Sequence, residues 1–293
     1  MRFALTVIVA LLAASTDART IHSETSLYQN ILVTEEGSVR CMQFTVRKDQ
    51  RNQSCIDQRR PKHFVFPYAR MMMASLLLNP VPTNVLVVGL GGGTLPTALS
   101  ELYPNASIDV VEIDPAVVIV AKRYFGFKPT DNMHVFEQDA RVWAKRAEGS
   151  SKRYDLIMLD AFNGDYIPEH LMTREYLAET RALLTNDGVL ASNTFAISRL
   201  YHNESVTYAD VFGPFFNLRS DDTANRVIIA SHGALPDTGK RMDTAKALVE
   251  PLKPYGVPIE DYASTMHTSA DWDVTARILT DQYSPANLLK AQP

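Results

Sequence analysis

Between residues 84 and 231 the chain alternates short, almost wholly apolar runs with stretches of helical periodicity, and this alternation constrains the fold most. The apolar runs are NVLVVGL, SIDVVEI, MHVFEQ, YDLIMLD, GVLASNTF and NRVIIAS, most of them bracketed by Gly, Pro, Asp or Asn. Strands that are apolar on both faces are typical of a parallel sheet with helices covering each side. We therefore predict an α/β fold built on such a sheet.

The chain changes character on both sides of this α/β region, which we place at residues 76–232. Residues 19–75 begin with short strands of alternating polarity, as in YQNILVTEEGSVRCMQFTV, and predict a small β-hairpin region. Residues 233–293 read as a mainly helical extension. Residues 1–18, MRFALTVIVALLAASTDA, carry one Arg, an apolar stretch and a small-residue end, which is the layout of a cleaved export signal.

This leader predicts an exported protein, periplasmic or secreted, with no stable membrane insertion once the leader is removed. Its apolar stretch is shorter than the roughly 20 residues of a membrane span, and an uncleaved anchor is the alternative. The two cysteines of the chain, Cys41 and Cys55, flank the polar, turn-like KDQRNQ. In an oxidising compartment they would pair across a hairpin, whereas the alternative is two unrelated reduced thiols. The leader favours the disulfide.

Composition and charge argue against two classes of partner. The 293 residues are 46% hydrophobic, enough for a substantial core, and the formal net charge is only −4. Acidic and basic residues are interspersed, so we predict no nucleic-acid partner. Four histidines lie in different predicted elements without the spacing of metal ligands, so we predict no metal. They are His63, His134, His170 and His202.

The first two strands are followed by a glycine loop and an acid. Ligands of an open parallel sheet bind outside the carboxyl ends of its strands. The first strand runs into GLGGGTLP, where Gly89, Gly91 and Gly93 let a ligand approach the backbone. The loop lacks the Lys-Ser/Thr ending of a triphosphate-binding loop. About 20 residues farther on, Glu112 is placed to accept hydrogen bonds from both hydroxyls of a ribose.

Acids also follow the third and fourth strands. Asp139 is placed to receive the exocyclic amine of adenine while the Ala140 backbone meets the ring nitrogens, although an isolated Asp here would more often be a helix N-cap. Asp160 ends the fourth, apolar strand. The sequence shows no second nucleotide-binding half. A glycine loop, a ribose acid, an adenine acid and a strand-four acid therefore indicate an S-adenosyl site rather than a dinucleotide site.

With these residues the chain resembles the spermidine synthase family of polyamine aminopropyltransferases. The resemblance covers about residues 26–231, in LYQNILV, VLVVGLGGGTLPTAL, VVEIDPAVVIVAKRYF, QDARVW and YDLIMLDAFNGDYIPEHL. It implies a Rossmann-like methyltransferase fold with a mostly parallel, seven-stranded sheet. It implies decarboxylated S-adenosylmethionine as co-substrate, contacted by Gln29, Glu112, Asp139 and Ala140. It also implies that Asp160 is the catalytic acidic residue and that Pro168 belongs to the loop covering the thioadenosine.

The amine side of the predicted site departs from the family pattern. Thr94 stands where the family usually has an acid, and Asn163 replaces an aspartate for which Asp165 is a candidate substitute. Tyr68 is kept, but the next two residues, ending in Arg70, replace a polar residue and an acid. An Arg near a cationic substrate weakens binding unless an acid neutralises it. We expect a divergent member whose acceptor is putrescine or a related polyamine.

Asp160 has a clear role in such a reaction. An alkyl amine with a pKa near ~10 is protonated at neutral pH and cannot attack. A carboxylate can orient the amine and accept its proton while the nitrogen displaces a thioether from the sulfonium-bound methylene. The expected partner is therefore a small amine, and a second copy of the chain, in a homodimer, is a further candidate. One alternative is a methyltransferase that uses intact S-adenosylmethionine, with Arg70 or loop amides binding the carboxylate of that donor. The other is a non-catalytic exported binding protein.

Overall fold

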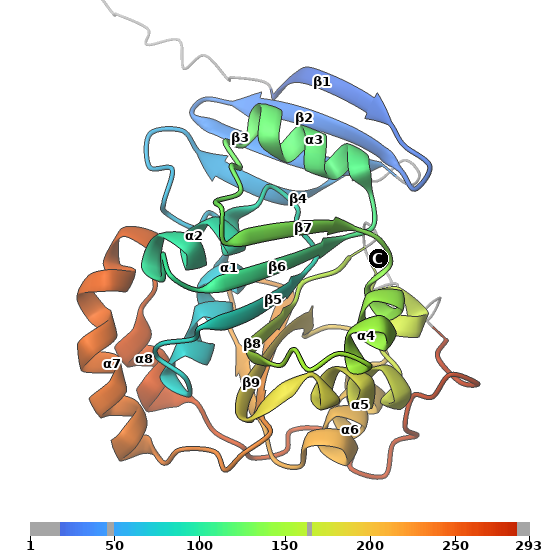
Figure 1. Ribbon diagram of the computed structural model, residues 1–293, viewed down its shortest axis with the longest axis vertical. Helices are drawn as coiled ribbons and strands as arrows, with labels where there is room; N and C mark the ends of the chain where they lie inside the picture. The colour runs from blue at the N-terminus through green and yellow to red at the C-terminus, as the bar shows by residue number, and fades with distance from the viewer. Residues whose placement is uncertain (1–17, 46–49, 163–165, 286–293) are drawn as a thin grey trace, which may run out of the picture.

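The computed structural model describes residues 18–45, 50–162 and 166–285, and its elements form two sheets with helices around them (Figure 1). The predicted leader, apart from Ala18, lies outside these ranges. The first sheet is antiparallel, in the order β1-β2-β3-β4. Its strands are β1 (Arg19–Thr25), β2 (Asn30–Glu36), β3 (Val39–Thr45) and β4 (Gln50–Asp57).

The second sheet has seven strands in the order β10-β11-β9-β8-β5-β6-β7. Its strands are β5 (Asn84–Val88), β6 (Ser107–Glu112), β7 (Met133–Glu137), β8 (Tyr154–Leu159), β9 (Leu184–Phe195), β10 (Phe216–Arg219) and β11 (Asn225–Ser231). The pairs among β5 to β9 are parallel, whereas β11 runs antiparallel to β9 and β10 antiparallel to β11. The predicted mostly parallel, seven-stranded sheet is confirmed, with β10 added to the six apolar runs.

Helices cover both faces of this sheet, which explains why its strands are apolar throughout (Figure 1). In β5, Val85 and Val87 face one core while Leu86 and Val88 face the other, and all four are buried. Burying each such side chain contributes about 1.5–3 kcal/mol. The first face packs against α1 (Pro67–Met72), η1 (Met73–Leu77), α2 (Thr94–Leu102), α3 (Pro115–Tyr124), α7 (Thr238–Leu252), η3 (Lys253–Tyr255) and α8 (Ile259–Thr265). The second packs against α4 (Ala140–Glu148), η2 (Glu169–Leu171), α5 (Arg174–Ala182) and α6 (Tyr201–Phe212).

Helix α3 connects the two sheets, since it contacts both β2 and β6. Its N-cap is Asp114, whose side chain accepts a hydrogen bond from the Ala116 N–H at 3.0 Å. The same carboxylate accepts the Ser26 hydroxyl at 2.5 Å. Ser26 starts the turn between β1 and β2, so one side chain both caps a helix and ties the small sheet to the large one.

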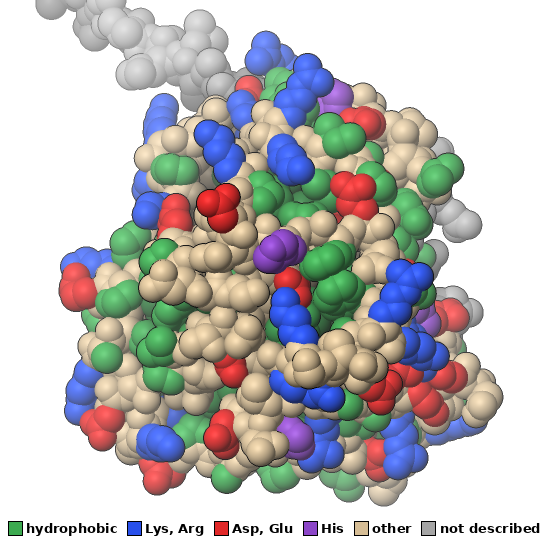
Figure 2. All heavy atoms as spheres, viewed as in Figure 1, with side chains coloured by type: hydrophobic (Ala, Val, Ile, Leu, Met, Phe, Trp, Pro, Cys, Tyr) green, Lys and Arg blue, Asp and Glu red, His purple; other side chains and the backbone are tan. Residues whose placement is uncertain are grey.

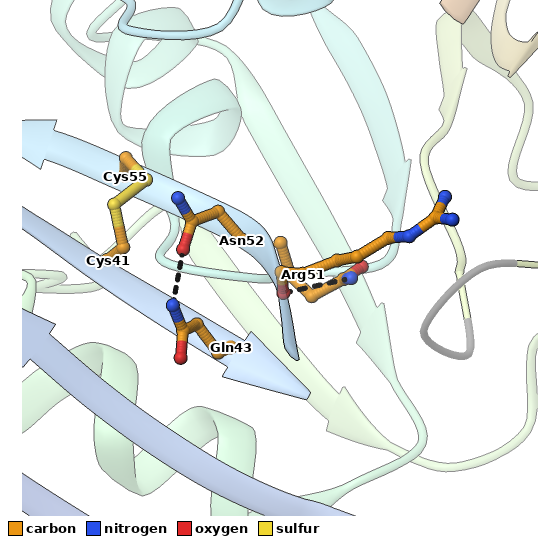
Figure 3. Close-up of a disulfide and its surroundings, with 6 residues drawn as sticks. Cys41, Gln43, Arg51, Asn52 and Cys55 are labelled. Carbon is orange, nitrogen blue, oxygen red and sulfur yellow. Dashed lines mark hydrogen bonds between the residues drawn. A yellow bond between two sulfur atoms is a disulfide. The ribbon is translucent and has the colours of Figure 1, made fainter. Parts of the chain in front are cut away.

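Cys41 and Cys55 form a disulfide across β3 and β4, where they are direct partners in the strand register (Figure 3). The alternative of two unrelated thiols is therefore not what the structure has. Next to the disulfide, the Gln43 Nε2 donates to the Asn52 Oδ1 at 2.8 Å on the same strand pair. The residue before Cys55 is Ser54, which lies against the glycine loop that follows β5. The disulfide thus fixes the strand that borders this loop.

Charged side chains of both signs are interspersed over the face shown in Figure 2, in keeping with the small net charge. No helix within the described ranges has the length and apolarity needed to cross a bilayer. Across the same ranges, histidines, cysteines and acids nowhere gather in groups of three or more that could hold a metal ion.

Candidate active site

A cavity of about 470 Å³ lies where the carboxyl ends of the parallel strands meet the four-stranded sheet. It collects residues from loops that are far apart in the sequence because neighbouring parallel strands end at the same edge. The predicted site residues that line it are Gln29, Tyr68, Gly89, Gly91, Thr94, Glu112, Asp139, Ala140, Asp160 and Pro168. The predicted amine contacts Asn163 and Asp165 lie outside the described residues.

The glycines of the loop after β5 serve two different purposes. Gly89 has a φ of 92°, and a Cβ on it would lie 2.3 Å from the Asp160 carbonyl oxygen, so only glycine lets β5 and β8 end this close together. Gly93 does not line the cavity. A Cβ there would lie 2.4 Å from the Phe127 ring, so this glycine allows the start of α2 to pack on Phe127.

Glu112 is buried at the end of β6 with both oxygens anchored by backbone N–H groups. Its Oε2 accepts from Leu90 in the glycine loop at 2.9 Å, and its Oε1 accepts from Asp114 at 3.0 Å. Burial raises the pKa of Glu112, and the bonds from Asp114 and Leu90 oppose this rise. A carboxylate has about four acceptor sites, so each oxygen retains capacity for one hydroxyl of a ribose.

Asp139 is both the N-cap of α4 and a cavity residue. Its Oδ1 accepts from the N–H groups of Arg141 and Val142 at 3.0 and 2.9 Å. Its Oδ2 is 2.8 Å from the His170 Nε2, and this hydrogen bond is the main reason why the pKa of Asp139 is lowered. The neighbouring Ala140 N–H is at the first helical position, where the helix itself supplies no acceptor. The pair offers an acceptor beside a donor, which matches the amine and ring nitrogen of adenine.

Asp160 follows β8, is partly buried and lines the cavity. Its Oδ1 accepts the Asn193 Nδ2 at 2.8 Å and its Oδ2 accepts the Tyr68 hydroxyl at 3.3 Å. Burial raises the pKa of Asp160 to about 7; the two hydrogen bonds oppose the rise, and the negative charge of Glu112 adds to it. A carboxyl group with a pKa near neutrality is well suited to accept and release a proton at physiological pH.

Arg70 does not line the cavity, although it is only two residues from Tyr68. Its charge acts on other neighbours: burial, Arg60 and then Arg70 lower the pKa of His63, and Arg70 also interacts with Tyr262. The expected conflict between this arginine and a cationic substrate therefore does not arise. The alternative in which Arg70 holds the carboxylate of a donor is removed for the same reason.

Sequence reasoning missed several residues of the site. Asn193 is a polar residue inside the apolar run GVLASNTF, and this was the available signal; it meets Asp160 because Ser192 pairs with Leu159 in the β8–β9 register. His170 was considered only as a metal ligand, although it lies two residues after Pro168. Gln53, Ser54, Phe162 and Tyr166 also line the cavity, and no local pattern marks them.

The charged residues of the cavity wall are all acidic. Glu112, Asp139, Asp160 and Glu169 line it, and no Lys or Arg does so among the described residues. Aromatic side chains also line it, namely Tyr28, Phe44, Tyr68, Phe162 and Tyr166. Clustered carboxylates concentrate cations, and aromatic faces bind alkyl chains and ammonium groups. The arrangement is suited to a positively charged nucleoside and an amine, with a base between them.

Residues 65–216 match the family model of the spermine/spermidine synthase domain. A polyamine aminopropyltransferase of Vibrio vulnificus (strain CMCP6) is 52% identical over 272 residues, which are 92% of this chain and 91% of the relative. A probable spermidine synthase from Corynebacterium glutamicum ATCC 13032 superposes with a TM-score of 0.65 at 18% identity, over 88% of this chain and 98% of that one. Human methyltransferase-like protein 13 in complex with SAH superposes with a TM-score of 0.58 at 27% identity, over 72% and 96%.

Proposed function

The chain belongs to the spermine/spermidine synthase family, and on this premise we propose that it moves an aminopropyl group from decarboxylated S-adenosylmethionine to a small amine. The observation that carries the proposal is the position of Asp160, a carboxyl group with a pKa of about 7 in a cavity that Glu, Asp and no Lys or Arg line among the residues that the structure describes. Glu112 at the end of β6 and Asp139 after β7 both lie on one side of it, beyond β5 in the sheet, where they fit the ribose and the adenine.

In the proposed reaction the neutral amine nitrogen attacks the methylene bonded to the sulfonium sulfur. A nitrogen–carbon bond forms, the carbon–sulfur bond breaks, and its electron pair goes to sulfur, which leaves as neutral methylthioadenosine. Asp160 takes the proton of the attacking amine, and Tyr68 and Asn193 hold its two oxygens in place. A positioned general base contributes about 10²–10⁴-fold to such a step.

The charge of the cavity favours the decarboxylated donor over the intact one. The intact donor carries a carboxylate, which would enter a cavity lined by Glu112, Asp139, Asp160 and Glu169. Placing like charges opposite each other costs several kcal/mol. Arg70, the side chain considered for neutralising that carboxylate, lies outside the wall. This argument favours aminopropyl transfer over methyl transfer on the same fold and leaves the amides of the glycine loop as the other candidates for holding that carboxylate.

We further propose that the protein acts outside the cytosol. The predicted leader and the Cys41–Cys55 disulfide both fit an oxidising compartment. The acceptor is proposed to be putrescine or a related polyamine, because Asp160 orients one primary amine while the aromatic wall accommodates an alkyl chain.

The test is calorimetry on the leader-free protein with methylthioadenosine, S-adenosylmethionine and its decarboxylated form, followed by a transfer assay. We expect the decarboxylated donor to bind at least roughly tenfold more tightly than the intact one. Tighter binding of the intact donor with methyl transfer would establish the methyltransferase alternative. Absence of binding by all three ligands would leave a non-catalytic binding protein.

Asp160→Asn tests the base directly. We expect turnover to fall by about 10²–10⁴-fold while the affinity for methylthioadenosine stays within a few-fold, because the amide cannot accept the proton but keeps the shape of the wall. Asp131→Asn, which changes an exposed aspartate, is the matched control. Equal turnover of the two variants would remove Asp160 from the role of base.

A further inference from the structure

His170 lines the cavity on a short backbone segment that two hydrogen bonds hold. It lies in the short helix η2, where the Leu171 N–H donates to the Pro168 carbonyl at 2.9 Å. From outside the cavity, the Ser284 hydroxyl donates to the Glu169 carbonyl at 2.9 Å. The imidazole therefore contacts Asp139 from a backbone segment that hydrogen bonds hold on both sides of it.

The hydrogen bond between the His170 Nε2 and the Asp139 Oδ2 leaves Asp139 with one acceptor position toward the cavity. The Oδ1 is fully engaged in capping α4, so a ligand can reach only the Oδ2, which His170 already holds. A carboxylate is purely an acceptor, so the Nε2 carries the hydrogen in this bond. An oxygen of a carboxylate accepts two hydrogen bonds, which leaves room for a second donor beside the imidazole.

We infer that His170 sets the base preference of the nucleoside site by holding the Oδ2 of Asp139 where it accepts the 6-amino group of adenine. This inference rests on the proposed function, since it specifies how the donor's nucleoside is chosen. A 6-oxo base presents an acceptor at the same point and is repelled by the fixed carboxylate. His170 acts through Asp139 and does not touch Asp160, so it is a positioning residue rather than a catalytic one.

The test compares methylthioadenosine with its 6-oxo counterpart, methylthioinosine, in two variants. His170→Leu removes the donor, whereas the amide nitrogen of His170→Gln can reach the position of the imidazole Nε2. We expect the leucine variant to bind methylthioadenosine roughly 10-fold more weakly, with little change for methylthioinosine, so that the preference for adenine shrinks. The glutamine variant should restore the preference. In the transfer assay, the donor KM of the leucine variant should rise while kcat stays unchanged.

An equal loss of affinity for both nucleosides in the leucine variant would overturn the inference, as would an unchanged preference or a glutamine variant that fails to restore it. Thermal melts of both variants check that each is folded. If the unaltered protein binds no methylthioadenosine, the proposed function fails and this inference with it. If it prefers adenine through His170 but transfers no aminopropyl group, only the proposed function fails.

Discussion

At the scale of single residues, the pKa of Asp160 depends on Asn193. Burial alone would push the pKa of Asp160 higher, and the hydrogen bond from the Asn193 amide is the first influence that opposes it. The amide is itself oriented, because its Oδ1 accepts the Asn225 Nδ2 at 3.0 Å. Asn193 therefore presents its NH₂ group, and not its oxygen, to the carboxylate.

Asn193→Leu should move the acidic limb of the kcat/KM profile to higher pH. With the hydrogen bond gone, the pKa of Asp160 rises further above about 7, so less of the carboxylate is ionised at neutral pH. The measurement is kcat/KM from pH 5 to 9. The control is Ser192→Ala, which changes the adjacent residue. Its hydroxyl accepts a hydrogen bond from Tyr208, whereas the donors to Asp160 are Asn193 and Tyr68, so the acidic limb of this variant should stay in place. A limb that stays in place in the leucine variant as well would contradict this account.

At the scale of elements, the site depends on the junction between β5 and β8. Gly89→Ala puts a Cβ 2.3 Å from the Asp160 carbonyl oxygen at a φ of 92°, so both the clash and the backbone strain must be relieved by moving the strand ends. We expect a loss of about 2–6 kcal/mol in the free energy of unfolding. Turnover should fall by about 10²-fold, as misplacement of a base by 1 Å predicts. Denaturant unfolding and the transfer assay measure the two effects.

Gly37→Ala is the control for backbone strain alone. Gly37 also has a positive φ, 58°, but a Cβ there would meet nothing within 4 Å. Its cost should be near ~1–2 kcal/mol with unchanged turnover. Equal effects of the two substitutions would mean that the contact with Asp160 is unimportant.

The same elements show what sequence can and cannot give. Apolar runs bounded by turn residues marked six of the seven strands of the large sheet. The acids Glu112, Asp139 and Asp160 were found because they lie at or directly after the ends of three of those runs. Asn193 and His170 contact two of these acids, but their positions arise from strand register and from a bend after Pro168. Arg70 shows the reverse error, since closeness to Tyr68 in sequence did not place it in the cavity.

At the scale of the whole molecule, Asp160 should make the protein less stable as the pH rises. Its pKa is raised from 3.8 to about 7 on folding, so between these values the folded state binds more protons than the unfolded state. The contribution of Asp160 to the free energy of unfolding therefore decreases from about pH 4 to pH 7 and levels off above. Asp160→Asn should remove this loss and be more stable by roughly 2–4 kcal/mol at pH 8, with a smaller gain at pH 5.

Denaturant unfolding at both pH values measures this difference, with Asp131→Asn beside it. A gain for Asp160→Asn that is the same at pH 5 and pH 8 would show that the carboxyl group is not held protonated by its surroundings. The lower stability of the unsubstituted protein at high pH would then follow from the burial of the Asp160 carboxylate in the cavity wall.

The all-acidic wall of the cavity also bears on how a catalytic cycle ends. A sulfonium nucleoside arrives as a cation and is drawn toward the carboxylates, but once its alkyl arm has been handed over the same nucleoside is an uncharged thioether. The electrostatic attraction to the carboxylates is lost when the sulfonium becomes a thioether, so the product nucleoside should dissociate faster than the donor. Added salt screens this attraction and should reduce the difference between the two dissociation rates.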